Sequence, residues 1–230
     1  IAACKASFTG QFLATMLQLN LPYCSKSVGD GLQTPPIGGR CIAMVVTRVE
    51  VTPKQGEGMR DVRGDSVRRQ LLSDHDINAS DVRSIVGFLI QSEISGEEIA
   101  QRADDLFTDP IIEIGSTNQL AISNSEIFTE TPDCVITIGF KPGVTDNPGK
   151  AALDGFQTIF PQATNAEIST YITYAFYGLP SDCDSQWLAG TIHNGLIQRA
   201  IISDSNACQN GQWAEIEFPQ RPPQVFTTPD

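Results

Sequence analysis

Two histidines, six cysteines and several paired acids are the side chains of this chain that could carry acid–base, nucleophilic or metal chemistry. His75 lies between two aspartates at the polar end of a predicted helix, where a solvated side chain is expected. His193 stands just before a helix terminator, so its imidazole is expected to bond the last helical carbonyls. The acid pairs at 97–98 and 104–105 fall on solvent-facing helix positions. This spacing therefore predicts no converging catalytic groups.

The sequence also lacks the motifs that mark metal, nucleotide or nucleophile sites. The cysteines form no Cys-x-x-Cys pair and have no histidine at ligand spacing, which predicts reduced and mostly buried thiols. There is no phosphate-binding Gly-x-x-x-x-Gly-Lys-Ser/Thr loop, and Gly56-Glu57-Gly58 lacks the third glycine of a dinucleotide fingerprint. No serine or cysteine stands in a nucleophile elbow. The chain itself is therefore expected to hold no catalytic, cofactor or metal site.

Composition narrows the class of partner. The 230 residues are 40% hydrophobic, enough to bury a core, and the formal net charge is −12. Nucleic acids and anionic membranes both need a basic face, so neither is an expected partner. No apolar run approaches the roughly 20 residues that a transmembrane helix requires.

One predicted turn joins a strand to the helix that follows it. Residues 134–140 are β-branched and apolar, as expected for a buried strand, whereas residues 152–160 carry apolar side chains at helical spacing. The stretch from Lys141 to Lys150 must join them. Pro142 and Gly143 suit a tight turn, and Asp146 or Asn147 can cap the helix that follows.

A second copy of this pattern occurs earlier in the chain. Four groups of similar residues follow one another in the same order, each separated from its counterpart by 85 to 87 residues: Lys54 and Lys141, Asp61 with Gly64 and Asp146 with Gly149, Val82 and Ile168, and Ile111 and Leu196. A constant spacing of this kind indicates a tandem duplication.

Each repeat is predicted to have the order βαβαβ. In the first, strands are expected at 45–52, at 81–94 with a bulge at Gly87, and from Ile111; Ser95 and Glu98 form a capping box that starts the second helix. In the second, strands are expected at 134–140, 168–178 and 197–202, with one more short strand at 214–218. The aromatic residues of 168–178 are expected to be core or interface. The predicted fold class is α+β, with mainly antiparallel sheets and helices on one face.

The repeats set the expected domain boundaries: 44–120 for the first, 121–133 for a linker, 134–218 for the second, and 219–230 for a proline-rich tail leading to further domains. Residues 1–43 are basic, rich in hydroxyl side chains and poor in acids. They fit translated sequence that is not part of the natural protein, or an organelle transit peptide; a secretory signal fits less well, because its basic start and apolar core are missing.

The second repeat resembles a known family. Lys141-Pro142-Gly143-Val144, Asp146, Gly149-Lys150-Ala151 and the closing stretch Asn194-Gly195-Leu196-Ile197-Gln198 are similar to the small PurS subunit of phosphoribosylformylglycinamidine synthase. Two such units in tandem resemble the N-terminal region of the long, fused form of that enzyme. The first repeat departs from the pattern, because Gln55-Gly56 replaces Pro-Gly and the loop to Asp61 is two residues longer.

The resemblance implies a role in de novo purine biosynthesis, as part of an ATP-dependent carbon–nitrogen ligase that uses glutamine as amide donor. In that family ATP, magnesium and the catalytic residues belong to the synthase and glutaminase portions, which are the expected partners. This chain would be a non-catalytic, cytoplasmic scaffold between them, or a plastid or mitochondrial one if 1–43 is a transit peptide. The candidate interface residues are Lys141, Pro142, Gly143, Asp146, Gly149, Asn194, Leu196, Ile197 and Arg199. The alternative is a small-ligand-sensing or dimerisation module unrelated to catalysis.

Overall fold

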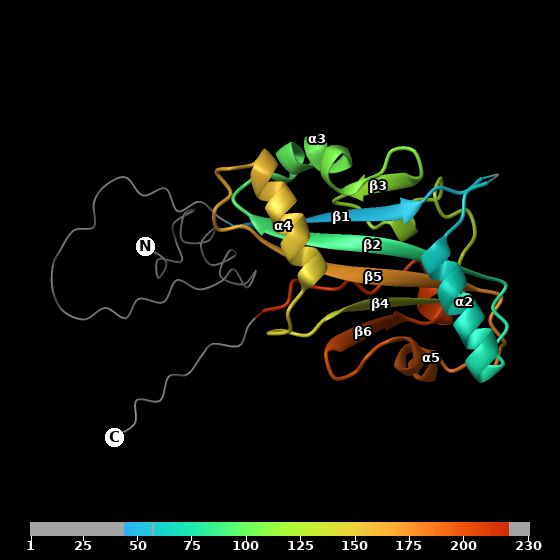
Figure 1. The fold of residues 1–230 in the computed structure, drawn as a ribbon. Helices are drawn as coiled ribbons and strands as arrows, with labels where there is room; N and C mark the ends of the chain where they lie inside the picture. The colour runs from blue at the N-terminus through green and yellow to red at the C-terminus, as the bar shows by residue number, and fades with distance from the viewer. Residues whose placement is uncertain (1–43, 57, 221–230) are drawn as a thin grey trace, which may run out of the picture. The chain divides into compact units, whose positions relative to one another are not determined.

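Six antiparallel strands form one open sheet in the computed structural model, which describes residues 44–56 and 58–220 (Figure 1). The strands are β1 (Val45–Pro53), β2 (Asp81–Ser92), β3 (Glu113–Thr117), β4 (Cys134–Phe140), β5 (Glu167–Tyr177) and β6 (Gln198–Ser203). The predicted α+β class and antiparallel pairing are confirmed. The predictions for residues 1–43 and for 221–230 of the tail fall outside the described residues.

The spatial order of the strands is β3-β1-β2-β5-β4-β6. The first half of the chain therefore contributes β3-β1-β2, the second half contributes β5-β4-β6, and the two central strands join them. That joint is long: β2 and β5 pair continuously from Asp81 opposite Tyr177 to Gln91 opposite Glu167. One sheet thus runs through both halves, and each half leaves one short edge strand at the outside.

The strand register is the same in both halves. On β1, Val49 pairs with Phe88 on one side and with Thr117 on the other. On β4, Ile136 pairs with Tyr174 and with Ile202. The equivalent positions are therefore Val49 and Ile136, Phe88 and Tyr174, and Thr117 and Ile202. The members of each pair are 85 to 87 residues apart, the same spacing as in the sequence repeat. A slip of one residue in either half would reverse the face of every side chain on that strand.

The four helices of eight or more residues in the described part of the chain cover one face of the sheet, which agrees with the prediction only for these longer helices (Figure 1). In the first half, α2 (Val62–His75) and α3 (Gly96–Phe107) follow β1 and β2; in the second, α4 (Asn147–Ile159) and α5 (Ser185–Ile192) follow β4 and β5. Side chains of α3 and α4 share one apolar cluster, centred on the fully buried Phe156 and Ile99. Side chains of α2 and α5 share another, with Leu71 and Leu188 at its centre. Each cluster therefore combines a helix from each half.

The opposite face is covered by irregular segments, and here one prediction was wrong. Residues 214–218 are not a strand. Instead, Ile216 is buried against Leu89 and Tyr171, and its carbonyl accepts a hydrogen bond from the Arg48 guanidinium at 3.3 Å. The Arg48 side chain thus donates a hydrogen bond to a backbone carbonyl that a neighbouring strand would otherwise bond. The 3₁₀ turn η1 (Ala121–Ser123) and the short helix α6 (Ser205–Gln209) lie on this same face.

The bulge predicted at Gly87 is also absent. Gly87 pairs in register with Glu50 on β1 and with Tyr171 on β5. A Cβ atom at this position would lie 2.0 Å from Cζ of Tyr171. Glycine is present here because the tyrosine ring crosses the strand, not because the strand bends.

Candidate functional site

The candidate interface residues of the second half meet at one corner of the sheet, where β4 ends and β6 begins. The backbone N–H of Lys141 donates to the carbonyl of Ile197 at 3.0 Å, and its Nζ donates to the carbonyl of Gly195. Gly143 has a φ of +85°, which favours glycine, and the turn closes through a bond from Val144 N–H to the Lys141 carbonyl at 3.1 Å. We call residues 141–145 and 194–199 the second corner.

Asp146 fixes the helix behind this corner. One of its carboxylate oxygens accepts from the N–H of Gly149 at 2.7 Å and from the hydroxyl of Thr170 at 2.9 Å. The other accepts from the N–H of Thr170 at 2.6 Å. A Cβ atom on Gly149 would lie 2.7 Å from the carbonyl oxygen of Ile168. The predicted N-cap is thus confirmed, and it also ties α4 to β5.

The tip of the second corner is apolar and exposed. Asn194 holds the loop, since its side-chain oxygen accepts from the N–H of Leu196 at 3.0 Å and its own N–H donates to Gln198 Oε1 at 2.8 Å. Leu196 is 86% exposed on this hydrogen-bonded loop. Arg199 instead reaches the carbonyl of Glu217 on the other face. Arg199 is therefore engaged within the chain, whereas Leu196 is available to a partner.

The first half builds the same corner, which the sequence analysis did not select as a site. The N–H of Lys54 donates to the carbonyl of Ile112 at 2.8 Å, and its Nζ donates to the carbonyl of Pro110. Asp109 accepts from the N–H of Ile111 at 2.9 Å, matching Asn194. Ile111 is 74% exposed. We call residues 54 and 109–113 the first corner; the signal that could have revealed it was the repeat spacing itself.

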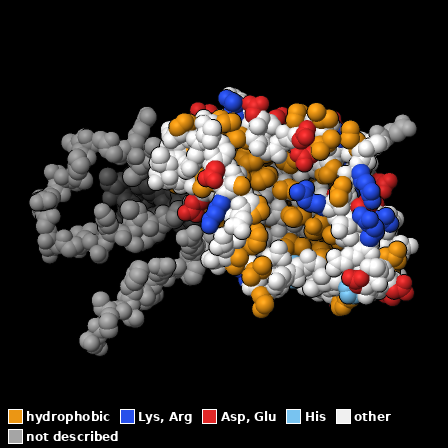
Figure 2. Space-filling model, viewed as in Figure 1, with side chains coloured by type: hydrophobic (Ala, Val, Ile, Leu, Met, Phe, Trp, Pro, Cys, Tyr) orange, Lys and Arg blue, Asp and Glu red, His pale blue; other side chains and the backbone are white. Residues whose placement is uncertain are grey.

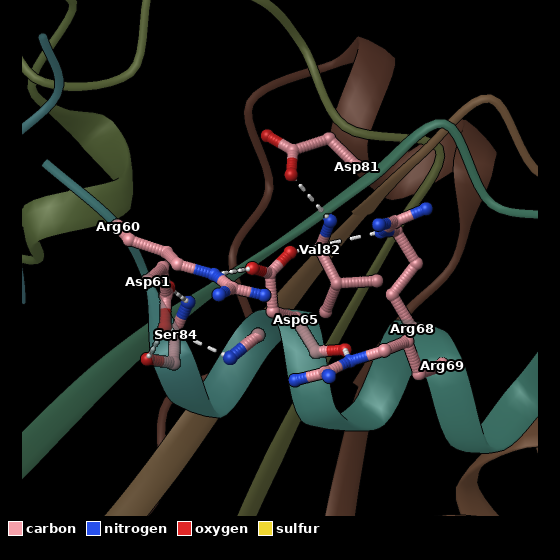
Figure 3. A network of polar contacts seen from close by, with 9 residues as sticks. Arg60, Asp61, Asp65, Arg68, Arg69, Asp81, Val82 and Ser84 are labelled. Carbon is pink, nitrogen blue, oxygen red and sulfur yellow. Dashed lines mark hydrogen bonds and ion pairs between the residues drawn. The ribbon is translucent and has the colours of Figure 1, made fainter. Parts of the chain in front are cut away.

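The cap of α2 repeats the cap of α4 (Figure 3). Asp61 accepts from the N–H of Gly64 and from the hydroxyl of Ser84, both at 2.8 Å, and from the N–H of Ser84. Ser84 takes the place that Thr170 holds in the second half. A Cβ atom on Gly64 would lie 1.9 Å from the carbonyl oxygen of Val82, so the helix start touches the strand backbone.

Asp65, one turn further along α2, lies among arginines (Figure 3). Arg60 donates to its carboxylate, and Arg68 lies 3.7 Å from it. The hydrogen bond from Arg60 lowers the pKa of the Asp65 carboxyl below its ordinary value. Asp65 is therefore a paired surface acid and not a proton donor or acceptor for chemistry near neutral pH.

Glu50 is a buried carboxylate that the sequence analysis missed. It is 2% exposed on β1 and accepts from the phenol of Tyr171 and from the N–H of Ala121, each at 2.5 Å. Desolvation raises the pKa of the Glu50 carboxyl, although the two hydrogen bonds and Arg48 oppose that shift. Glu50 thus links the first half, the second half and the linker. A single glutamate among the valines of 45–51 was the available signal.

Among the described residues, the histidines make contacts within the fold, and two of the three cysteines are buried thiols. His193 Nδ1 lies 2.5 Å from the carbonyl of Ala189, as predicted for a helix end, and exposed His75 packs its edge on Trp187. Burial raises the pKa of the Cys134 thiol to about 12 and that of Cys208 to about 11, so both stay protonated. Within 44–56 and 58–220, no three His, Cys, Asp or Glu residues converge as metal ligands, and no helix is long and apolar enough to cross a membrane.

No protein-family model and no curated protein matches the sequence. The resemblance to PurS thus remains a hypothesis that rests on the residues of the two corners and their helix caps.

Proposed function

We propose that this chain is a tandem duplication of a PurS-like unit and forms the non-catalytic N-terminal part of phosphoribosylformylglycinamidine synthase. That enzyme would convert formylglycinamide ribonucleotide to its amidine, using ATP and ammonia released from glutamine. The chain would act as a scaffold that docks the glutaminase portion against the synthase portion. ATP and magnesium would bind to the synthase portion, and the amide chemistry would take place in the partners.

The recurrence of one corner at both ends of the sheet is the observation that carries this proposal. In each half a lysine that ends the first strand bonds the loop before the third strand, through both its backbone N–H and its side chain. In each half an aspartate caps the first helix and holds the middle strand. These are the residues that carry the family resemblance. Their contacts support a duplicated unit with a fixed surface at each corner.

The corners also suit docking in physical terms. Leu196 and Ile111 are large apolar side chains, exposed at 86% and 74%, on loops that hydrogen bonds hold in place. A rigid support reduces the conformational entropy that a loop loses on binding. Apolar side chains that insert into a partner commonly carry much of the binding free energy of an interface. A partner that covers these corners would remove both side chains from water.

Replacing Leu196 with aspartate should impair transfer of ammonia without affecting the synthase chemistry. In a mixture of this chain with the synthase and glutaminase portions, at limiting concentration of the chain, L196D should lower glutamine-dependent amidine formation by about tenfold. Activity with added ammonium should stay within about twofold, because the synthase would no longer need ammonia from the glutaminase. The assay is the rate of amidine formation with each nitrogen source.

Leu72→Asp is the matched control for this prediction. Leu72 lies on α2, belongs to neither corner and is 46% exposed, so L72D makes the same change of side chain and charge at a less exposed position. L72D should leave both rates unchanged. Equal rates for L196D, L72D and the unmodified chain would refute docking at the second corner.

A further inference from the structure

A groove of about 490 Å³ opens on the helix-covered face, between the pair α2 and α5 and the pair α3 and α4. Figure 2 shows hydrophobic side chains gathered there, between the helices, around a basic group. The floor is formed by the central strands, through Val86 and Phe88 of β2 and Ile172 and Tyr174 of β5. The two helix pairs pack on opposite ends of the central strands and leave the middle of this joint open (Figure 1).

Both halves contribute equivalent residues to the groove. Val86 corresponds to Ile172 and Phe88 to Tyr174 in the repeat, and Phe107 at the end of α3 corresponds to Ile192 at the end of α5. The groove is therefore a product of joining two halves along β2 and β5. Its volume lies within the roughly 300–1,000 Å³ that is typical of small-molecule sites, and its lining is mostly aliphatic and aromatic with a few polar groups.

The charge of the groove is opposite to that of the chain. Arg63 is the one charged residue among the described residues that line it, whereas the whole chain carries a net charge of −12. Arg63 is exposed at the first turn of α2 and takes part in none of the ion pairs of the described residues. The nearby Asp61 is already bonded to Gly64 and Ser84. A cation without a partner at the mouth of an apolar groove favours an anionic ligand with an apolar body.

Polar groups near Arg63 would help to orient such a ligand. Tyr174 and Gln198 line the same groove. Burial raises the pKa of the Tyr174 phenol while the charge of Arg63 opposes that shift, which puts the guanidinium and the phenol within electrostatic reach of each other. The phenol therefore stays protonated near neutral pH and can donate to an anionic oxygen.

We propose that this groove binds a small organic anion whose aliphatic or aromatic body lies over Phe88 and Ile172 and whose carboxylate or sulfonate pairs with Arg63. This site does not rest on the proposed scaffold role, although Gln198 belongs both to the groove and to the second corner. It requires only the joined sheet and the ends of the four helices.

The test uses the whole chain with two probes, the fluorescent sulfonate 8-anilinonaphthalene-1-sulfonate and decanoate. The sulfonate should bind with one site per chain, and decanoate should displace it, whereas acetate, which lacks the apolar body, should not. Decanol, which lacks the charge, should compete about tenfold more weakly than decanoate. Absence of saturable sulfonate binding would overturn the proposal and leave the groove as a surface for a helix of another polypeptide.

Two matched pairs of variants locate the binding. Ala152 lines the groove, while its neighbour Ala151 is exposed on the same helix, so A152F should weaken binding of both probes at least tenfold and A151F should not. R63Q should weaken binding about five- to tenfold, and R69Q, an exposed change on the same helix, should not. Equal affinities within both pairs would place the probes elsewhere and refute the site. Because R63Q changes an exposed residue, it tests the site even if A152F folds poorly.

Discussion

Replacing Gly64 with alanine should lower the free energy of unfolding by at least about 3 kcal/mol. The added Cβ would lie 1.9 Å from the carbonyl oxygen of Val82, which is backbone of a central strand and cannot rotate away. The first turn of α2 would have to move off β2, and the hydrogen bonds that Ser84 donates to Asp61 would stretch or break. Urea unfolding followed by circular dichroism measures the effect.

Gly190→Ala is the control for that prediction. Gly190 lies within α5, and apart from its chain neighbours and the surrounding helix backbone no atom lies within 4 Å of where its Cβ would be. Alanine there should stabilise the chain by roughly 0.5–1 kcal/mol, the ordinary difference between the two residues in a helix. Gly149→Ala should change the free energy of unfolding by an amount between those of the other two variants, because its Cβ would lie 2.7 Å from the carbonyl oxygen of Ile168. A G64A chain as stable as the unmodified chain would contradict the close contact of α2 with β2.

Replacing Glu50 with alanine should also cost about 3 kcal/mol. The change leaves the N–H of Ala121 and the phenol of Tyr171 buried without their common acceptor, and each unsatisfied group costs about 1–3 kcal/mol. Glu50→Gln keeps one oxygen that can accept from the N–H of Ala121 and places an amide NH2 that can donate to the phenol oxygen of Tyr171, with nearly the same volume and without the buried charge. E50Q should therefore be at least as stable as the unmodified chain at neutral pH.

The unmodified chain and E50Q should also differ in how their free energy of unfolding depends on pH. The folded structure raises the pKa of Glu50 above its ordinary value, so the folded state holds this proton more tightly than the unfolded state. The stability that Glu50 contributes is then fully present below the pKa that its carboxyl has in the unfolded state. It is lost as pH rises through the higher pKa that the carboxyl has in the folded state. As pH rises from the ordinary pKa of a glutamate through the raised pKa of folded Glu50, the difference in unfolding free energy between the unmodified chain and E50Q should shift toward E50Q. A shift toward the unmodified chain would contradict desolvation as the dominant effect.

Local signals in the sequence predicted much of the fold. Asp146, Pro142 and Gly143 define a strand-to-helix turn within ten residues, and Ser95 with Glu98 forms a capping box that the structure contains. These features depend on residues that are close together in the sequence, so the order of residue types along the chain is enough to predict them. The repeat spacing then aligned the strands of the two halves, and the observed register follows it.

Features made by distant residues were not predicted. Glu50 meets partners that lie 71 and 121 residues away in the chain, and no local pattern encodes such a meeting. The central groove exists because β2 pairs with β5 and the two helix pairs lie at opposite ends of that joint. Residues 214–218 alternate like a half-buried strand, but the same alternation places Ile216 against Tyr171 on the covered face. Alternation alone does not distinguish these two outcomes.

The most direct test of the scaffold proposal mixes this chain with purified synthase and glutaminase portions of the same organism's phosphoribosylformylglycinamidine synthase. Amidine formation is followed with glutamine and, separately, with ammonium, and the mixture is run on a sizing column. The proposal predicts a complex that contains the chain and a glutamine-dependent rate that appears only when the chain is added. No complex and no change in either rate would contradict it.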